Sequence, residues 1–448
     1  MRMALAHTQI GRTERRNGSP GSGPHLVDGK KQHRPVLRSL GLGLITGAAD
    51  DDPSAIGTYA SAGTKFGLSL LWTVPVIFPM MVAVTYLCSK MGQVTGQGLF
   101  EVIREHYPRW LLHFALIGVV IGNTIEAGAD LGGMAAAVNV LLPIPMPWVV
   151  VGTALIVLGF QLLGSYTLIR NIFRWLALAL LAYVGSAILA KPKLLPVIRA
   201  TLIPSIHFKH NFLAILVAII GTTLSAYLFT WQSNQEVEEE ISTGRKRLED
   251  RRGATVAEIS RAKWDVILGM LFANVIMYFI MLSTASTLFT AGKTDISSAA
   301  EAAQALQPLV GKAAGLLFAI GVVGVGFLAI PIMTTGAAYD LCQTFGWKYG
   351  LHAKPLQAKK FYVAITAFTF IAAAMNFFGV NPIKALIWAG IVQGFSAPPL
   401  MLLIMLITNN PKIMGEFVNR RRMNLLGWIT TGCIFAAALA LVLSWAWS

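Results

Sequence analysis

Charged residues are scarce in this sequence of 448 residues: Asp, Glu, Lys and Arg together make up 13%, whereas 55% of the residues are hydrophobic. Apolar runs of 18 or more residues recur along nearly the whole chain, and no polar stretch between them is long enough for a soluble domain. Runs of this length are typical of membrane-spanning helices. The scarcity of charge therefore predicts an all-α polytopic membrane protein.

Cysteine is also rare, and Cys88, Cys342 and Cys433 show no paired spacing, so we expect reduced thiols. The sequence lacks the Gly-x-x-x-x-Gly-Lys-Ser/Thr motif of ATP-binding proteins. It also lacks the His/Glu spacing of a metal hydrolase and any nucleophile motif. These absences argue against an enzyme and predict neither a catalytic residue nor a cofactor. A metal sensor is not favoured either, because the chain has no soluble output domain.

Acidic residues number 21 against 36 basic ones, which gives a formal net charge of +15. In a soluble protein this charge would suggest nucleic acid as a partner, but among membrane spans it indicates the enrichment of Lys and Arg in cytoplasmic loops. With the N-terminus inside, all basic residues but eight fall in the tail or in cytoplasmic loops. The eight exceptions are Lys65, Lys191, Lys193, Arg199, Lys209, Lys293, Lys312 and Lys384. We therefore predict a multi-pass protein of the plasma membrane, a bacterial inner membrane, with a cytoplasmic N-terminus, an extracytoplasmic C-terminus and no nucleic-acid partner.

The hydrophobic runs predict eleven transmembrane helices. Residues 1–39 are basic and lack the apolar segment of a signal peptide, so we expect a disordered cytoplasmic tail. The spans are predicted in the windows 40–62, 68–90, 111–140, 148–165, 173–190, 211–235, 265–291, 312–345, 360–379, 383–408 and 425–447.

Three consecutive carboxylates, Asp50, Asp51 and Asp52, interrupt the first window. Charges at this depth in a membrane are costly unless they have a function. Asp52 followed by Pro53 is typical of a helix start, with Asp52 as the N-cap. The window is therefore predicted to form two half-helices, whose exposed carbonyls and the Asp52 carboxylate would bind a cation. The alternative is that Asp52 only caps a helix while its neighbours reach toward an interface.

The sixth window contains a second candidate break, where Gly221 could leave helical geometry and Thr222, Thr223 and Ser225 supply hydroxyls. These hydroxyls could instead bond to helix carbonyls or allow close helix packing. Breaks in the first and sixth spans are the pattern of two five-span repeats of inverted topology with a site between them. The predicted organisation is a tail at 1–39, a first repeat at 40–190, an extracellular loop at 191–210, a second repeat at 211–408, and a loop with the last span at 409–448.

The predicted inside loop at 236–263 starts with an acidic cluster of Glu236, Glu238, Glu239 and Glu240, followed by several basic residues. Acidic residues at the C-terminal end of a helix oppose its dipole, and the basic residues would compensate them. A solvated charged loop and a funnel for metal exit are the two interpretations of this segment.

These features resemble the Nramp family of divalent-metal transporters over nearly all of residues 40–447. The segment from Asp52 to Ala55 resembles the family's Asp-Pro-Gly-Asn motif, and Gly221 to Tyr227 resembles its Gly-Ala-x-x-Met-Pro-His pattern. Ala129-Asp130-Leu131 and the segment 409–417 resemble two further stretches. The resemblance implies a LeuT-type 5+5 inverted repeat with broken helices 1 and 6.

The sequence departs from the family pattern at the positions that bind metal. The family's methionine falls on Ser225, its alanine on Thr222 and its asparagine on Ala55. Its two sixth-span histidines fall on Tyr227 and Gln232. This pattern resembles the Nramp-related magnesium transporter branch, although that branch has a proline where this chain has alanine before the tyrosine.

Loss of the methionine removes a soft ligand that favours manganese and iron over magnesium. The remaining ligands are oxygens, which suit Mg²⁺, an ion that usually keeps several waters behind one or two carboxylates. All eight histidines lie in the tail, in loops or at span ends, so we expect weak or absent proton coupling. The candidate metal-site residues are Asp52, Asp51, Ala55, Thr222, Thr223, Ser225 and Gln393, and the candidates for coupling or an access path are Glu126, Asp130 and Tyr227.

The sequence thus predicts a secondary transporter that imports hydrated divalent cations, chiefly Mg²⁺ and also Mn²⁺, by alternating access. One alternative is a proton-coupled Mn²⁺ or Fe²⁺ carrier, and another is an amino-acid carrier of the same architecture, which should have few acids at its helix break. The predicted partners are the metal ion and the lipid bilayer. A monomer would suffice for transport, and the sequence predicts no oligomeric state.

Overall fold

The computed structural model describes residues 42–163, 178–296 and 298–445, and all regular secondary structure in these residues is helical. The predicted tail at 1–39 and the start of the fifth window lie outside them. The helices are α2 (Leu42–Asp50), α3 (Pro53–Phe66), α4 (Thr73–Thr95), α5 (Leu99–His106), α6 (Arg109–Asn139), α7 (Met146–Leu163), α9 (Ala182–Leu189), α10 (Leu194–Leu202), α11 (His210–Thr223), α12 (Ala226–Ser242), α13 (Leu248–Arg251), α14 (Val256–Thr284), α15 (Ala299–Ala303), α16 (Gln307–Val310), α17 (Ala314–Phe345), α18 (Lys359–Met375), α19 (Pro382–Thr408), α20 (Pro411–Met414) and α21 (Arg421–Trp445). Short 3₁₀ or π turns are η1 (Gly67–Leu70), η2 (Leu178–Leu181), η3 (Ala285–Phe289), η4 (Gln304–Leu306), η5 (Gly311–Ala313) and η6 (Gly415–Phe417).

Within the described residues, eight helices are long and apolar enough to cross a membrane. The polytopic all-α fold is thereby confirmed, whereas the number of eleven spans stays a prediction. The first predicted span is divided between α2 and α3, and α18 has only 17 residues. The fifth predicted span, 173–190, begins outside the described residues.

The first predicted break is confirmed between α2 and α3. Helix α2 ends at Asp50, and Asp52 has the extended backbone of an N-cap residue, with φ −61° and ψ 172°. Its carboxylate accepts a hydrogen bond from the backbone N–H of Ala55 at 2.7 Å, and Pro53 is the first residue of α3. A side-chain cap of this kind stabilises a helix by roughly 1 kcal/mol, so the sequence restarts the helix at this point.

The second predicted break is confirmed between α11 and α12, but it does not involve Gly221. Helix α11 ends at Thr223, Leu224 and Ser225 are not helical, and α12 starts at Ala226 without a proline. Gly221 lies inside α11, where a Cβ atom would collide with the Gly390 carbonyl oxygen and the Gly394 nitrogen. The expectation that Gly221 leaves helical geometry is therefore wrong, because this glycine instead allows α11 to approach α19 closely.

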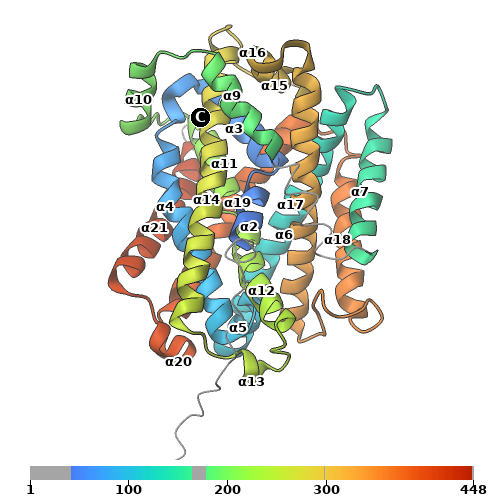
Figure 1. Ribbon diagram of the computed structural model, residues 1–448, viewed down its shortest axis with the longest axis vertical. Helices are drawn as coiled ribbons and strands as arrows, with labels where there is room; N and C mark the ends of the chain where they lie inside the picture. Colours follow the sequence, from blue (N-terminus) through green and yellow to red (C-terminus); the bar gives the residue numbers. More distant parts are fainter. Residues whose placement is uncertain (1–41, 164–177, 297, 446–448) are drawn as a thin grey trace, which may run out of the picture. The chain divides into compact units, whose positions relative to one another are not determined.

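Both broken spans lie inside the bundle. Helix α14 packs against α2 and α3, α19 packs against α3 and α11, and α6 contacts α3, α17 and α19. Figure 1 shows α2 and α3 following each other through the middle of the bundle, with α7 and α18 at one side and α21 at the other. The breaks are therefore enclosed by other helices, which is where non-helical backbone at membrane depth is tolerated.

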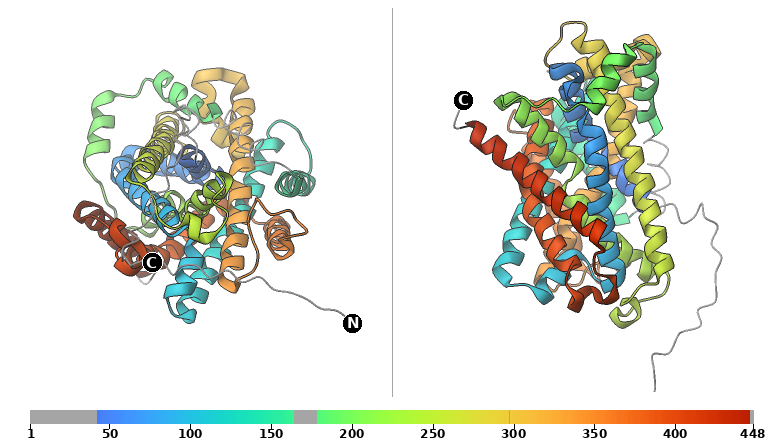
Figure 2. Two further views of the ribbon diagram at one scale, coloured as in Figure 1. Left: turned by 60° about the horizontal axis from the view of Figure 1, so that its bottom comes forward. Right: turned by 90° about the vertical axis from the view of Figure 1, so that its left-hand side faces the viewer.

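The loops predicted to be cytoplasmic gather at one end of the bundle, as far as they lie in the described residues. Helices α5, α13 and α20 and the loop between α17 and α18 lie at the lower end in Figure 1, and α10, α15 and α16 lie at the upper end. The second view in Figure 2 shows the same separation along the long axis.

The acidic cluster at the start of the predicted inside loop, 236–263, belongs to helix α12 and not to a solvated loop. Helix α12 continues to Ser242, and the side chains of Glu236, Glu238 and Glu240 are buried. The interpretation as a solvated charged segment is therefore wrong for these three residues. Polar groups from other parts of the chain donate hydrogen bonds to the carboxylates of Glu236 and Glu238, and Arg245 forms an ion pair with Glu240.

Candidate functional site

Tyr227 connects the two breaks. Its hydroxyl lies 2.9 Å from the carbonyl oxygen of Ala49, near the end of α2, and 3.0 Å from Oδ2 of Asp52. The last carbonyls of a helix have no partner inside it. The Ala49 carbonyl and the Asp52 carboxylate therefore present two hydrogen-bond acceptors to the same space. The predicted meeting of a helix-end carbonyl with the Asp52 carboxylate is therefore present, with a phenol hydroxyl between them.

Asp50 and Asp51 are buried without hydrogen-bond partners. Both side chains are completely shielded from solvent, and no donor from the described residues reaches any of their four carboxylate oxygens. Buried carboxylates without partners are very costly and are rare in folded proteins. These two residues therefore place four carboxylate oxygens that are free to bind an ion at the break in the first span.

Two further acids reach this region from α6, four residues apart. Oδ1 of Asp130 accepts hydrogen bonds from the backbone N–H and the hydroxyl of Ser54, at 2.9 and 2.6 Å. Oε2 of Glu126 accepts one from the side-chain amide of Gln393 at 2.6 Å. The same amide lies 3.3 Å from Oδ1 of Asn123. Asp130 thus joins α6 to α3, while Glu126 joins α6 to α19.

The acids at the break have no basic partner. Within the described residues, no Lys, Arg or His forms an ion pair with Asp50, Asp51, Asp52, Glu126 or Asp130. The same residues contain no group of three or more His, Cys, Asp and Glu side chains arranged to hold a metal ion. The five acids face the region from the end of α2, from the break after it and from α6, and they do not form one ligand shell.

The three candidate hydroxyls of the sixth span differ in their contacts. Thr223 donates to the carbonyl of Ile219 at 2.7 Å, so the alternative of bonding within the helix holds for this residue. Ser225 donates to the carbonyl of Thr222 at 2.8 Å, across the break. The hydroxyl of Thr222 is buried and has no hydrogen-bond partner in the part of the chain that the structure describes.

Two other candidates, Ala55 and Gln393, offer no side-chain oxygen beside the Asp52 carboxylate. Ala55 is the third residue of α3, so its carbonyl belongs to the hydrogen-bond ladder of that helix and only its N–H contacts Asp52. Gln393 contacts Glu126 and also accepts from the hydroxyl of Ser396 at 2.9 Å. Its contacts therefore link α19 to α6 and do not reach Asp52.

Several residues of the site were not among the predicted ligands. Asp50 belongs to the same acidic run as Asp51, so the sequence alone is sufficient to place it at the site. Asn123 lies one helical turn before Glu126 on the same face of α6, a spacing that the sequence does display. Ser54 follows the Asp52-Pro53 pair, but its contact with Asp130 spans 76 positions and has no local signal.

A second polar network begins one turn beyond Tyr227 on α12. The carboxylate of Glu236 accepts hydrogen bonds from Ser89 at 2.6 Å, Gln93 at 2.8 Å and Gln232 at 2.9 Å. Gln232 in turn accepts from the hydroxyl of Thr46 on α2 at 2.7 Å. Polar side chains therefore continue from the broken first span along α12 toward the end of the bundle that carries α5 and α13.

Comparison with known proteins identifies the family. The profile described as natural resistance-associated macrophage protein-like, Nramp, matches residues 43–444. The divalent metal cation transporter MntH of Deinococcus radiodurans is 28% identical over 415 residues, covering 91% of this chain and 90% of that protein.

Solved structures show a similar fold. The manganese transporter of Eremococcus coleocola has a TM-score of 0.68 at 18% identity, covering 93% of this chain and 88% of that one. Mhp1, a nucleobase-cation-symport-1 family transporter, has a TM-score of 0.53 at 14% identity, covering 91% and 92%. These similarities confirm the LeuT-type fold with broken first and sixth spans. Because the family match extends over nearly all of the described residues, the chain belongs to the Nramp family and is a multi-pass membrane transporter of divalent metal ions, not an enzyme.

Proposed function

We propose that this Nramp-family protein imports hydrated divalent cations, with Mg²⁺ as its main substrate and Mn²⁺ as a second one. The observation that supports this most strongly is the group of buried acids without a basic partner. Several carboxylates at membrane depth are costly unless a cation shares their environment. A transported dication would supply the missing positive charge in this region.

The donor atoms near the break favour a hard ion. Asp51 and Asp52 offer carboxylates, Thr222 offers an unpartnered hydroxyl, and Ser225 keeps its lone pairs after donating its hydrogen. Position 225 carries no thioether, so the soft ligand that would favour Mn²⁺ is replaced by oxygen. Oxygen donors with space for water suit Mg²⁺.

The other candidates take supporting roles in this proposal. Ala55 provides room beside the Asp52 cap, Thr223 shapes the end of α11, and Gln393 holds Glu126 in place. Tyr227 holds the Asp52 carboxylate against the end of α2 until the ion enters.

We further propose that proton coupling is weak or absent. The two positions where the family pattern has histidines carry Tyr227 and Gln232, neither of which takes up protons near neutral pH. The membrane potential alone can drive uptake, because a dication crossing 100 mV gains about 4.6 kcal/mol. Alternating access would arise from movement between the repeats at 40–190 and 211–408, in a bacterial inner membrane with the N-terminus inside.

A second candidate is a proton-coupled Mn²⁺ or Fe²⁺ carrier. It is favoured by Oε1 of Glu126 and Oδ2 of Asp130, buried oxygens without a hydrogen-bond partner that could carry protons. The similar protein of Eremococcus coleocola is also named a manganese transporter.

Metal uptake into liposomes separates the two candidates. Purified protein would be tested with Mg²⁺, Mn²⁺ and Ca²⁺ outside and a pH-sensitive dye inside. Our proposal expects Mg²⁺ uptake without acidification of the interior. Acidification that accompanies Mn²⁺ uptake, with no Mg²⁺ uptake, would support the second candidate.

A further inference from the structure

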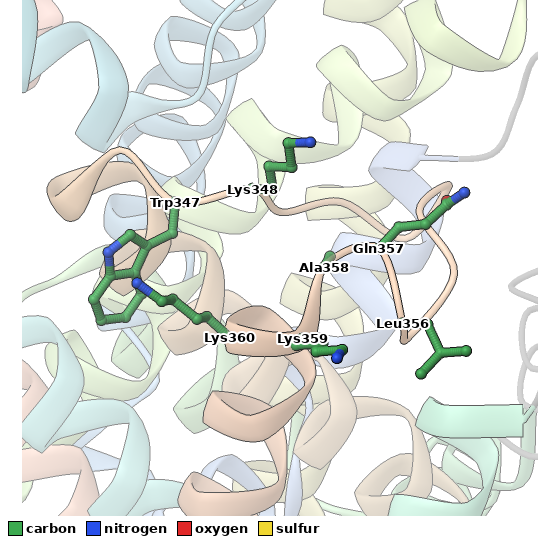
Figure 3. A pocket seen from close by; sticks show the side chains of 7 residues that line it. All are labelled: Trp347, Lys348, Leu356, Gln357, Ala358, Lys359 and Lys360. Carbon is green, nitrogen blue, oxygen red and sulfur yellow. The ribbon is translucent and has the colours of Figure 1, made fainter.

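The loop between α17 and α18, residues 346–358, returns close to its starting point, and its two ends line an open pocket of about 280 Å³. Figure 3 shows the Lys360 ammonium lying against the Trp347 ring, with Leu356 at the opposite end of the pocket. The lining residues are Trp347, Lys348, Leu356, Gln357, Ala358, Lys359 and Lys360. The pocket lies far along the chain from the helix breaks and has no part in the metal site.

The pocket carries three positive charges that no acid neutralises. Lys348, Lys359 and Lys360 are exposed, and in the described part of the chain none of them is within ion-pair distance of a carboxylate. The Lys360 ammonium lies 4.2 Å from the centroid of the Trp347 ring. This cation–π contact orients the lysine but leaves its charge in place, so the pocket is suited to an anion.

The pocket lies where a lipid-facing surface ends. Helix α18 begins at Lys359, and within one turn Val363 is 66% exposed on its outer face, followed by Phe370. Phe345, at the end of α17, is exposed and stacks on Trp347 with ring centroids 5.2 Å apart. Aromatic and basic side chains at the ends of membrane helices are typical of the headgroup region.

We propose that this pocket binds the headgroup of an anionic phospholipid. The lysines would contact the phosphate, and Leu356, which is 81% exposed, would lie against the first carbons of an acyl chain. A free phosphate ion would use the lysines but would gain nothing from the exposed leucine and phenylalanine. The combination of uncompensated charge with an apolar rim therefore favours a lipid.

The bound headgroup would restrain a loop that also holds the inner helices. In the middle of the loop, the Leu351 N–H donates to the Glu238 carboxylate on α12 at 3.0 Å, and His352 contacts the same group. The Tyr349 hydroxyl donates to Glu101 on α5 at 2.5 Å. The two ends of the loop thus bind the lipid while its middle contacts α5 and α12.

Native mass spectrometry of the full chain in detergent, with phosphatidylglycerol or phosphatidylcholine added, tests this proposal. The wild type should bind phosphatidylglycerol roughly tenfold more tightly than phosphatidylcholine. The triple variant Lys348→Gln, Lys359→Gln, Lys360→Gln should lose this preference, and Lys360→Gln alone should lose part of it. The control is Arg420→Gln, Arg421→Gln, Arg422→Gln, which removes three exposed charges outside the pocket and should keep the preference.

Three outcomes would overturn the proposal. The first is equal binding of the two lipids to the wild type. The second is an equal loss of preference in the lysine and arginine variants, which would mean that only total charge matters. The third is complete displacement of phosphatidylglycerol by millimolar inorganic phosphate, which would make the pocket a phosphate site. Melting temperatures measured for each variant show that the comparison is made between folded proteins.

Discussion

The hydroxyl of Tyr227 lies 3.0 Å from Oδ2 of Asp52, and this contact joins the two broken spans of the transporter. The partners are 175 positions apart in the sequence. The same hydroxyl contacts the Ala49 carbonyl, so it lies between two oxygens that we propose as contacts of the transported cation. Metal binding at Asp52 should therefore compete with this phenol.

The first prediction is that Tyr227→Phe increases the apparent affinity for Mg²⁺ by about tenfold. A hydrogen bond to a charged group contributes about 1.5–3 kcal/mol. Because the variant lacks the hydrogen bond from Tyr227 to Asp52, the metal does not have to displace it. Uptake into liposomes at varied Mg²⁺ concentration measures the change. Tyr183→Phe removes a buried hydroxyl that has no hydrogen-bond partner among the described residues, and it serves as the control. A lower affinity in Tyr227→Phe would show that the hydroxyl is itself a metal ligand.

The second prediction is that Ser225→Met shifts selectivity toward Mn²⁺. The thioether would add the soft ligand that this position lacks. When both ions are present, the ratio of Mn²⁺ uptake to Mg²⁺ uptake should rise by about tenfold or more. The control Ser242→Met lies at the far end of α12 and should leave the ratio unchanged. Unaltered selectivity in Ser225→Met would mean that position 225 does not face the ion.

The third prediction concerns the contact between α11 and α19. Gly221→Ala should lower the stability of the folded protein by about 1–3 kcal/mol, because the new methyl group would meet the backbone of Gly390 and Gly394. Thermal unfolding in detergent measures the change. Gly159→Ala, on α7 with nothing within 4 Å of the added carbon, should alter stability by less than about 1 kcal/mol. Similar melting temperatures for the two variants would contradict this close packing.

The sequence predicts features that depend on neighbouring residues and misses those that depend on distant ones. Asp52 and Pro53 are adjacent, so the helix restart could be predicted from them alone. The burial of Glu236 could not, because its donors Ser89 and Gln93 lie on another helix. The sequence alone makes Gly221 a candidate for a break, because its role in packing depends on α19 lying beside it.

The fourth prediction is a pH-dependent contribution of His352 to stability. Its hydrogen bond to Glu238 raises the pKa of the imidazole above its ordinary value of 6.5. Because the pKa is raised on folding, the stabilisation is complete below pH 6.5 and is lost as the pH rises through the folded-state pKa. The melting temperature of the wild type should exceed that of His352→Gln most clearly at low pH.

The control for this prediction is His113→Gln, which changes an exposed histidine on α6 that has no acidic partner among the described residues. Because this substitution removes no contact with a carboxylate of the described residues, it should not reproduce the loss of stability that His352→Gln causes at low pH. A difference between wild type and His352→Gln that grows as the pH rises would contradict the assigned direction.

Mg²⁺ uptake by Asp52→Asn tests the central claim most directly. Asparagine is as good an N-cap as aspartate, so the bond from the Ala55 N–H can remain while the charge is removed. The variant should melt at nearly the wild-type temperature but transport Mg²⁺ at a rate lower by about a hundredfold or more. The wild type should take up Mg²⁺ without acidifying the liposome interior. Transport by Asp52→Asn at the wild-type rate would contradict a cation site built on Asp52.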